Sequence, residues 1–179
     1  MTLIETLVAI SILAVAIVAP MSLTMQSLSS AYYARDQVIA SNLAQEAIES
    51  VRAVRDGNIL RIALNQPDVA CTPTNLLCGI PIGADFTIDT RDNEITRCDS
   101  DGTPGCPYLQ TDPAQTLYGY DNGWVDTIFT RTVHAEFVDV ANDEIRVTVT
   151  VTRVAGARTA PAVVLHENLY RWVEDGSGI

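Results

Sequence analysis

The chain has 179 residues, which is enough for one folded domain with its own core plus an additional segment. Its 11 basic residues are all arginine and face 22 acidic ones, giving a formal net charge of -11 and a pI near 4.4. This charge argues against binding nucleic acid, which needs a basic surface. The lack of lysine excludes assembly through lysine isopeptide bonds.

The first predicted element is a helix of membrane length. Residues 6–25 contain no charged side chain and consist mostly of Leu, Ile, Val and Ala. About 20 such residues, rising 1.5 Å each, cross a hydrocarbon core of about 30 Å. The acidic residue Glu5 precedes this run. A cleaved secretory signal instead has basic residues at this place and a shorter apolar region. We therefore expect the segment to belong to the mature protein.

Pro20 is the one helix-disrupting residue in this run. It lacks the N–H that would bond the carbonyl of Ala16, and its ring crowds that carbonyl. We expect a kink or an unwound stretch between residues 16 and 24. A kink that the membrane helix tolerates is one interpretation, and a hinge that lets the segment repack is the other.

Residues 26–56 predict an amphipathic continuation of the same helix. Apolar side chains recur at intervals of three, four and seven residues, without an intervening glycine or proline. Gly57 and Asn58 provide a stop signal, so one helix is expected from residue 2 to about 56. The predicted apolar stripe consists of Leu28, Tyr32, Ile39, Leu43, Ala47, Val51 and Val54.

Residues 58–123 contain most of the glycine, proline and asparagine and are predicted to form loops, with one strand at 84–90. All four cysteines lie here, and their spacings of six and seven intervening residues do not fit a zinc site. Disulfides in an oxidising compartment are favoured over unrelated thiols. Three pairings are possible, and our hypothesis is two local pairs, because each would bracket a turn-rich segment. These pairs are Cys71 with Cys78 and Cys98 with Cys106.

The acidic segment 98–106 raises the question of calcium. Asp99, Asp101 and either Asp92 or Glu94 offer the oxygen ligands that calcium prefers. Its glycine stands at the fourth position instead of the sixth, and no glutamate closes the loop, so the EF-hand pattern fails. Because turns favour the same residues, we predict no metal site and no cofactor, with calcium as the alternative.

Residues 124–179 predict an antiparallel sheet. Apolar and polar residues alternate in 129–137 and 144–153, with a turn at 139–143, and a weaker run follows at 160–173. The apolar face of such a sheet can be buried against the amphipathic helix, so the predicted fold class is α+β. The inward-facing residues are predicted to be Phe129, Val133, Ala135 and Phe137, then Ile145, Val147, Val149 and Val151.

The sequence offers little for catalysis. His134 and His166 are the only histidines, and neither lies in a setting that suggests a base paired with a nucleophile. A phosphate-binding glycine loop and a His-Glu zinc motif are both absent from the sequence. We therefore expect no catalytic residues and no enzymatic activity.

The segment MTLIETLVAISIL resembles the N-terminus of type IV pilins and pseudopilins. The helix through EAIESVRAVRD, followed by a sheet ending in LYRW, resembles minor pilins of this superfamily. The resemblance is specific over residues 1–25 and does not extend to 58–123. It implies a pilin-like fold and a prepilin peptidase that removes a short basic leader before Met1 and methylates the new amine. Many members have phenylalanine where this chain has Met1.

The resemblance also implies a function. Such a subunit is stored as a single-pass inner-membrane protein with its soluble domain outside the cytoplasm. Assembly machinery in that membrane then packs it, helix to helix, with copies of itself or other pilins into an extracellular filament. A shaft subunit is favoured, because the domain is modest in size. The alternatives are a pseudopilin of a type II secretion system, a minor or tip pilin, and a membrane-tethered binding domain that does not polymerise.

Adhesion, motility, secretion and DNA uptake are not distinguished by the sequence. The expected organisation is a membrane or filament-core helix at 1–25, an amphipathic helix at 26–57, a disulfide-containing loop region at 58–123 and a sheet at 124–179.

Glu5 has two interpretations. Residues 2–5 form an S/T-x-x-E capping box, in which a carboxylate stabilises the helix N-terminus. In the family that the chain resembles, this carboxylate meets the N-terminal amine of a neighbouring subunit, which here would be that of Met1. An isolated carboxylate is costly in an apolar filament core, and an amine relieves that cost. Both interpretations can hold at different stages of assembly.

Overall fold

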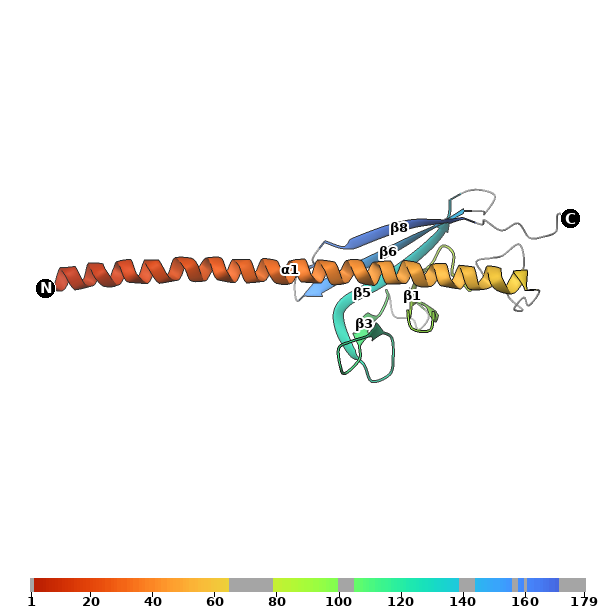
Figure 1. Cartoon of the computed structure of the whole chain (residues 1–179), viewed down its shortest axis with the longest axis horizontal. Helices are drawn as coiled ribbons and strands as arrows, with labels where there is room; N and C mark the ends of the chain where they lie inside the picture. Colours follow the sequence, from red (N-terminus) through yellow and green to blue (C-terminus); the bar gives the residue numbers. More distant parts are fainter. Residues whose placement is uncertain are drawn as a thin grey trace. The chain divides into compact units, whose positions relative to one another are not determined.

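The structure is a computed structural model that describes residues 2–64, 79–99, 105–138, 144–155, 158–159 and 161–170. It has two compact units, Met1–Ile39 and Ala40–Ile179. In the first, the described residues from Leu3 onward are all helical, and the second contains the rest of that helix and an eight-stranded sheet (Figure 1). The predicted α+β fold with a pilin-like architecture is confirmed.

Helix α1 spans Leu3–Ala63 and does not end at Gly57 and Asn58 as predicted. Gly57 does not adopt the positive φ of a helix-capping glycine. Asn58 and Ile59 are buried, and the Leu64 N–H donates to the Leu60 carbonyl at 3.0 Å. Burial of these side chains outweighs the weak local stop signal and carries the helix further.

A kink or an unwound stretch was expected at Pro20, and the unwound stretch is wrong, because residues 16–24 are all α-helical. Pro20 removes only the backbone hydrogen bond to the Ala16 carbonyl, and the adjacent turns of the helix keep their backbone hydrogen bonds. The carbonyl of Pro20 additionally accepts a bond from Thr24 Oγ1 at 2.9 Å. A hinge at Pro20 stays a prediction.

The face of α1 that is buried begins at Ala40, well after the predicted start near residue 26. Leu28 and Tyr32 are 53% and 54% exposed, although they continue the apolar periodicity. Small alanines alternate with larger side chains on the buried face, which lets the helix approach a sheet closely. The buried apolar residues of this face are Ala40, Leu43, Ala44, Ala47, Ile48, Val51 and Ile59.

The sheet is centred on β5 and β6. β5 pairs with β6 on one side and with β1 and β3 on the other, and all these pairings are antiparallel. β8 and β7 pair with β6, β2 pairs with β1, and β4 pairs with β3. The strands are β1 Asp85–Ile88, β2 Ile95–Arg97, β3 Tyr108–Thr111, β4 Tyr118–Gly119, β5 Val125–Phe137, β6 Glu144–Ala155, β7 Arg158–Thr159 and β8 Val163–Tyr170.

The strands β1, β5, β6 and β8 were predicted, and β2, β3, β4 and the two-residue β7 were not. These missed strands have only two to four residues, and β2, β3 and β4 lie within the region predicted to be loop. β2 is held extended by pairing with β1, β3 by pairing with the early part of β5, and β4 by pairing with β3. These pairings depend on contacts that a local pattern does not show. The predicted turn at 139–143 lies outside the described residues.

The core is formed by α1 from Ala40 onward and one face of the sheet. All four inward positions predicted for β6 are buried, as are Phe129, Val133 and Ala135 of β5. Phe137 is instead 41% exposed, because it is the last residue of β5 and lies at the end of the sheet's covered face. Complete burial of each large aliphatic side chain contributes roughly 1.5–3 kcal/mol.

A disulfide joins Cys98, which directly follows β2, to Cys106, which precedes β3. This local pairing is confirmed. Cys71 and Cys78 lie outside the described residues, as does Asp101 of the acidic segment. The disulfide thus ties together two of the short strands that the sequence did not predict.

Candidate functional site

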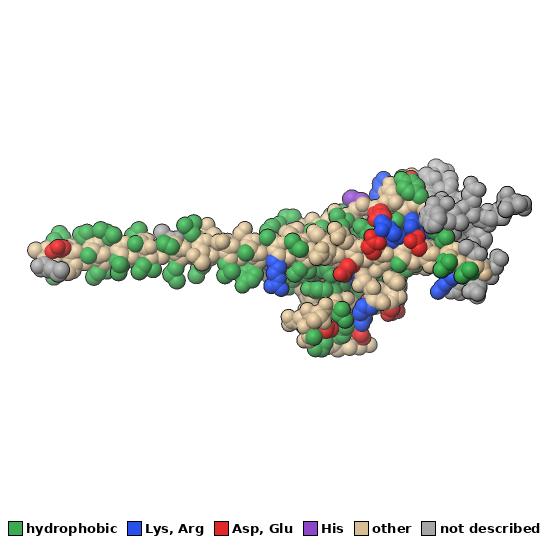
Figure 2. All heavy atoms as spheres, viewed as in Figure 1, with side chains coloured by type: hydrophobic (Ala, Val, Ile, Leu, Met, Phe, Trp, Pro, Cys, Tyr) green, Lys and Arg blue, Asp and Glu red, His purple; other side chains and the backbone are tan. Residues whose placement is uncertain are grey.

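The most conspicuous surface is the apolar part of α1 between Leu3 and Met25. Its large apolar side chains are 51% to 83% exposed, and Figure 2 shows them along the whole length of this segment. The helix is long and apolar enough to cross a membrane. Water does not favour so large an exposed apolar surface, so it marks contact with lipid or with protein.

Glu5 lies at the start of this surface and caps the helix. Thr2 occupies the N-cap position, and its N–H donates to Glu5 Oε2 at 3.4 Å, as in a capping box. The Glu5 N–H donates to the Thr2 carbonyl at 3.0 Å. A side-chain bond of 3.4 Å is long, and the carboxylate is exposed, so the cap leaves Glu5 accessible to another partner. Met1 lies outside the described residues.

Arg131 is a buried cation that the sequence analysis missed. It is 0% exposed, and its guanidinium donates to the carbonyls of Leu43 in α1 and Ile88 in β1. Its position between Phe129 and Val133 in the alternating pattern was the available signal, since alternation places it inward. No acidic side chain in the described part of the chain forms an ion pair with it. Arg131 therefore joins α1, β1 and β5 through hydrogen bonds to carbonyl groups.

The aromatic ring of Tyr120 lies beside this arginine. The guanidinium carbon of Arg131 is 6.0 Å from the ring centroid. Burial raises the pKa of the Tyr120 hydroxyl, and the nearby positive charge of Arg131 opposes this in part. The hydroxyl stays protonated near neutral pH, so the pair has one positive charge.

Asp89 is the centre of a polar cluster at the end of β1. Its carboxylate accepts bonds from Arg91 N, Nε and Nη2 at 3.1, 3.0 and 2.7 Å and from Tyr120 N at 3.0 Å. Burial by itself raises the pKa of Asp89, but the bonds from Arg91 and Tyr120 outweigh it and hold the pKa below its ordinary value. Asp89 is therefore charged at neutral pH and links the β1–β2 turn to the chain after β4.

Arg91 continues this cluster outward. Its Nη1 lies 3.2 Å from Asp121 Oδ2, and its guanidinium stacks over the Trp124 ring at 4.5 Å from the centroid. Gly119 provides the space, because a Cβ at this position would lie 2.9 Å from Asp89 Oδ2 and 3.0 Å from Arg91 Nε. The cluster fixes the two loops that form one wall of a groove.

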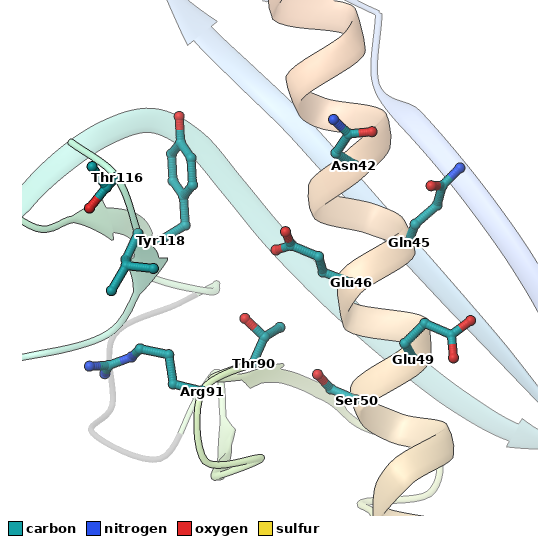
Figure 3. A pocket seen from close by; sticks show the side chains of 10 residues that line it. Asn42, Gln45, Glu46, Glu49, Ser50, Thr90, Arg91, Thr116 and Tyr118 are labelled. Atoms are coloured by element: carbon teal, nitrogen blue, oxygen red, sulfur yellow. The ribbon is translucent and has the colours of Figure 1, made fainter.

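The groove, of about 700 Å³, lies between residues 42–50 of α1 and the two loops. Thr90 and Arg91 come from the β1–β2 turn, Thr116 and Leu117 from the loop before β4, and Tyr118 is the first residue of β4. Figure 3 shows Glu46 extending from α1 into the space in front of Thr90 and Tyr118. Within the described residues, the Glu46 side chain has no hydrogen bond or ion pair, whereas Glu49 is paired with Arg52 at 2.7 Å. The groove therefore presents an unpaired carboxylate.

The two histidines lie on the outward face of the sheet. His134 Nδ1 is 2.7 Å from Asp85 Oδ1, and Thr148 Oγ1 is 2.9 Å from His166 Nδ1. The register places His134 opposite Thr148, and Thr148 opposite His166. The described residues contain no group of three or more side chains suited to hold a metal ion. The structure thus gives each histidine a local hydrogen-bond partner.

Comparison with known protein families, with curated proteins and with solved structures found no match for this chain. The fold nevertheless defines a class: a long N-terminal helix with an apolar segment, an antiparallel sheet and a disulfide are compatible with a pilin-like protein. The apolar helix could serve as a membrane anchor.

Proposed function

We propose that this chain is a structural subunit of a type IV pilus-like filament. The observation that carries the proposal is the exposed, uncharged segment of α1 that precedes a folded α+β domain on the same helix. This segment needs non-aqueous surroundings, which a bilayer supplies before assembly and the same segment of neighbouring subunits supplies afterwards. The resemblance of residues 1–25 to pilins supports the same conclusion.

In this proposal, Glu5 pairs with the N-terminal amine of a neighbouring subunit, exposed and methylated by prepilin peptidase at Met1. The accessible carboxylate at the edge of an apolar surface supports this role. Among the described residues, the Glu5 carboxylate accepts only the long bond from the Thr2 N–H. When the Glu5 carboxylate is buried among other helices, it needs a positive charge beside it, and the N-terminal amine of the neighbouring subunit provides that charge.

The proposed location follows from the same features. The subunit waits in the inner membrane with its domain outside the cytoplasm, and inner-membrane assembly machinery then moves it into the extracellular filament. The disulfide between Cys98 and Cys106 supports an oxidising compartment for the domain. A pseudopilin or a minor or tip pilin would share these features and differ in abundance.

A second candidate is a membrane-tethered domain that never polymerises, because a helix able to span a membrane supports an anchor equally well. Shearing fibres from cells and identifying their bulk subunit separates these functions. A shaft subunit dominates the fibre, and a minor or tip pilin is present in traces beside another pilin. A tethered domain stays in the membrane fraction, and that result would contradict the proposal.

The Glu5→Gln variant tests the assembly role directly. Glutamine also fits the third position of a capping box, so helix capping and membrane insertion should persist. We expect normal processing, normal membrane levels and a strongly reduced fibre yield. Glu94→Gln, which changes an exposed glutamate outside α1, is the matched control. A normal fibre yield from Glu5→Gln would leave capping as the role of this residue.

A further inference from the structure

Arg35 is a cation in the exposed part of α1 that has no partner among the residues the structure describes. It is the only lysine or arginine among the first 51 residues. Its side chain is exposed and makes no hydrogen bond or ion pair with the described residues. Subunits packed side by side along α1 would remove water from this arginine. A guanidinium in such a setting needs a carboxylate, since an unpaired buried charge is strongly destabilising.

The groove beside α1 has the complementary chemistry. Glu46 extends into it without a partner, and the side chains of Asn42 and Gln45 on the same helix also make no bond within the described residues (Figure 3). One carboxylate and two amide carbonyls are acceptors, and a guanidinium has five N–H donors in a planar fork. The groove therefore suits an arginine side chain.

Charges already in the groove favour the same occupant. Arg91 is the only basic side chain among the described residues that line it, and Asp89 and Asp121 already bind it. Glu49 is likewise paired with Arg52. The free charge in the groove is thus the negative charge of Glu46, which attracts a cation and repels an anion.

Arg35 and Glu46 are eleven positions apart in α1, whereas side chains of one helix pair at three or four positions. We propose that Arg35 of one subunit enters the groove of a second copy and pairs with its Glu46. This inference rests on the proposed filament function. The two surfaces are different, so the contact is heterologous and repeats from copy to copy as an open helical polymer. It also offsets part of the repulsion between chains of net charge -11.

Charge reversal in the full-length chain tests this pairing. Arg35→Glu and Glu46→Arg should each lower the yield of sheared fibres by about tenfold or more, as expected for breaking a desolvated pair. The double variant should restore the yield to within about threefold of the wild type, because it re-forms the pair with the charges exchanged. Arg35→Glu combined with Glu94→Arg has the same net charge as the double variant and should stay low.

Membrane levels and formation of the Cys98–Cys106 disulfide verify that each variant is made and folded. Normal fibre yield from either single reversal would overturn the pairing. Failure of the double variant to recover, with folding intact, would also overturn it. Recovery of Glu46→Arg by Arg97→Glu instead of Arg35→Glu would assign the groove to another arginine and reject this one. Absence of fibres from the wild-type chain would refute the filament function itself.

Discussion

Replacing Asp89 with asparagine should destabilise the domain in a pH-dependent way. Asp89 is 5% exposed, and its carboxylate accepts four hydrogen bonds, from three nitrogens of Arg91 and from Tyr120 N. Asparagine has one acceptor oxygen, and its amide group would face a donor. With the charge-assisted bonds lost and one donor unsatisfied, we expect a decrease of about 2–4 kcal/mol in the free energy of unfolding at pH 7.

The direction of the pH effect follows from the lowered pKa of Asp89. Its contribution is fully present above the unfolded-state pKa of about 3.9 and is lost as the pH falls through the lower folded-state pKa. The wild type and Asp89→Asn should therefore differ most at neutral pH. The difference should shrink as the solution is acidified below about pH 4.

Urea unfolding of the detergent-solubilised full-length chain measures this difference. Tryptophan fluorescence is a suitable signal, because Trp124 stacks against Arg91 in the same cluster. Asp99→Asn changes an exposed aspartate and should have little effect. Equal unfolding free energies for Asp89→Asn and the wild type at pH 7 would refute the reasoning, and so would a difference that stays constant into strong acid.

Three further stability predictions use the same unfolding measurement. Gly119→Ala should lower the free energy of unfolding by about 1–3 kcal/mol, because the added Cβ would clash with Asp89. An unchanged free energy would mean that the side chains of the cluster can move to accommodate the Cβ. Replacing Cys98 and Cys106 together by serine should lower the free energy of unfolding by about 2.5 kcal/mol through loop entropy, and an unchanged free energy would contradict a stabilising role for this disulfide. Leu43→Ala should cost about 2–5 kcal/mol, whereas Leu28→Ala, at a position 53% exposed, should be nearly neutral. Equal losses from these two leucine variants would contradict the observed start of the buried face.

The elements with strong local patterns were predicted from the sequence. Alternation at 144–153 specified both the strand β6 and its four buried residues, because a strand with one covered face repeats every two residues. The uncharged run after Glu5 specified an apolar helix by composition alone. The pairing of Cys98 with Cys106 was accessible for a similar reason, since the two residues are close in the chain.

Features that depend on distant contacts were decided by the tertiary structure. The apolar periodicity of α1 continues through Leu28 and Tyr32, but only the presence of the sheet determines that burial starts at Ala40. The helix passes Gly57 because Ile59 finds a buried environment, which a local stop signal cannot anticipate.

The candidate groove depends on distant contacts in the same way. Glu46 is an ordinary polar position on an amphipathic helix in the sequence, and residues 116–118 were predicted to be loop. Glu46 and residues 116–118 line the same groove because hydrogen bonds hold the wall opposite α1 in place. These bonds join Asp89 to Tyr120 and Arg91 to Asp121, which are about thirty residues apart in the chain. Periodicity reports which side of an element is buried, whereas the burial of Arg131 and the shape of the groove result from which elements pack together.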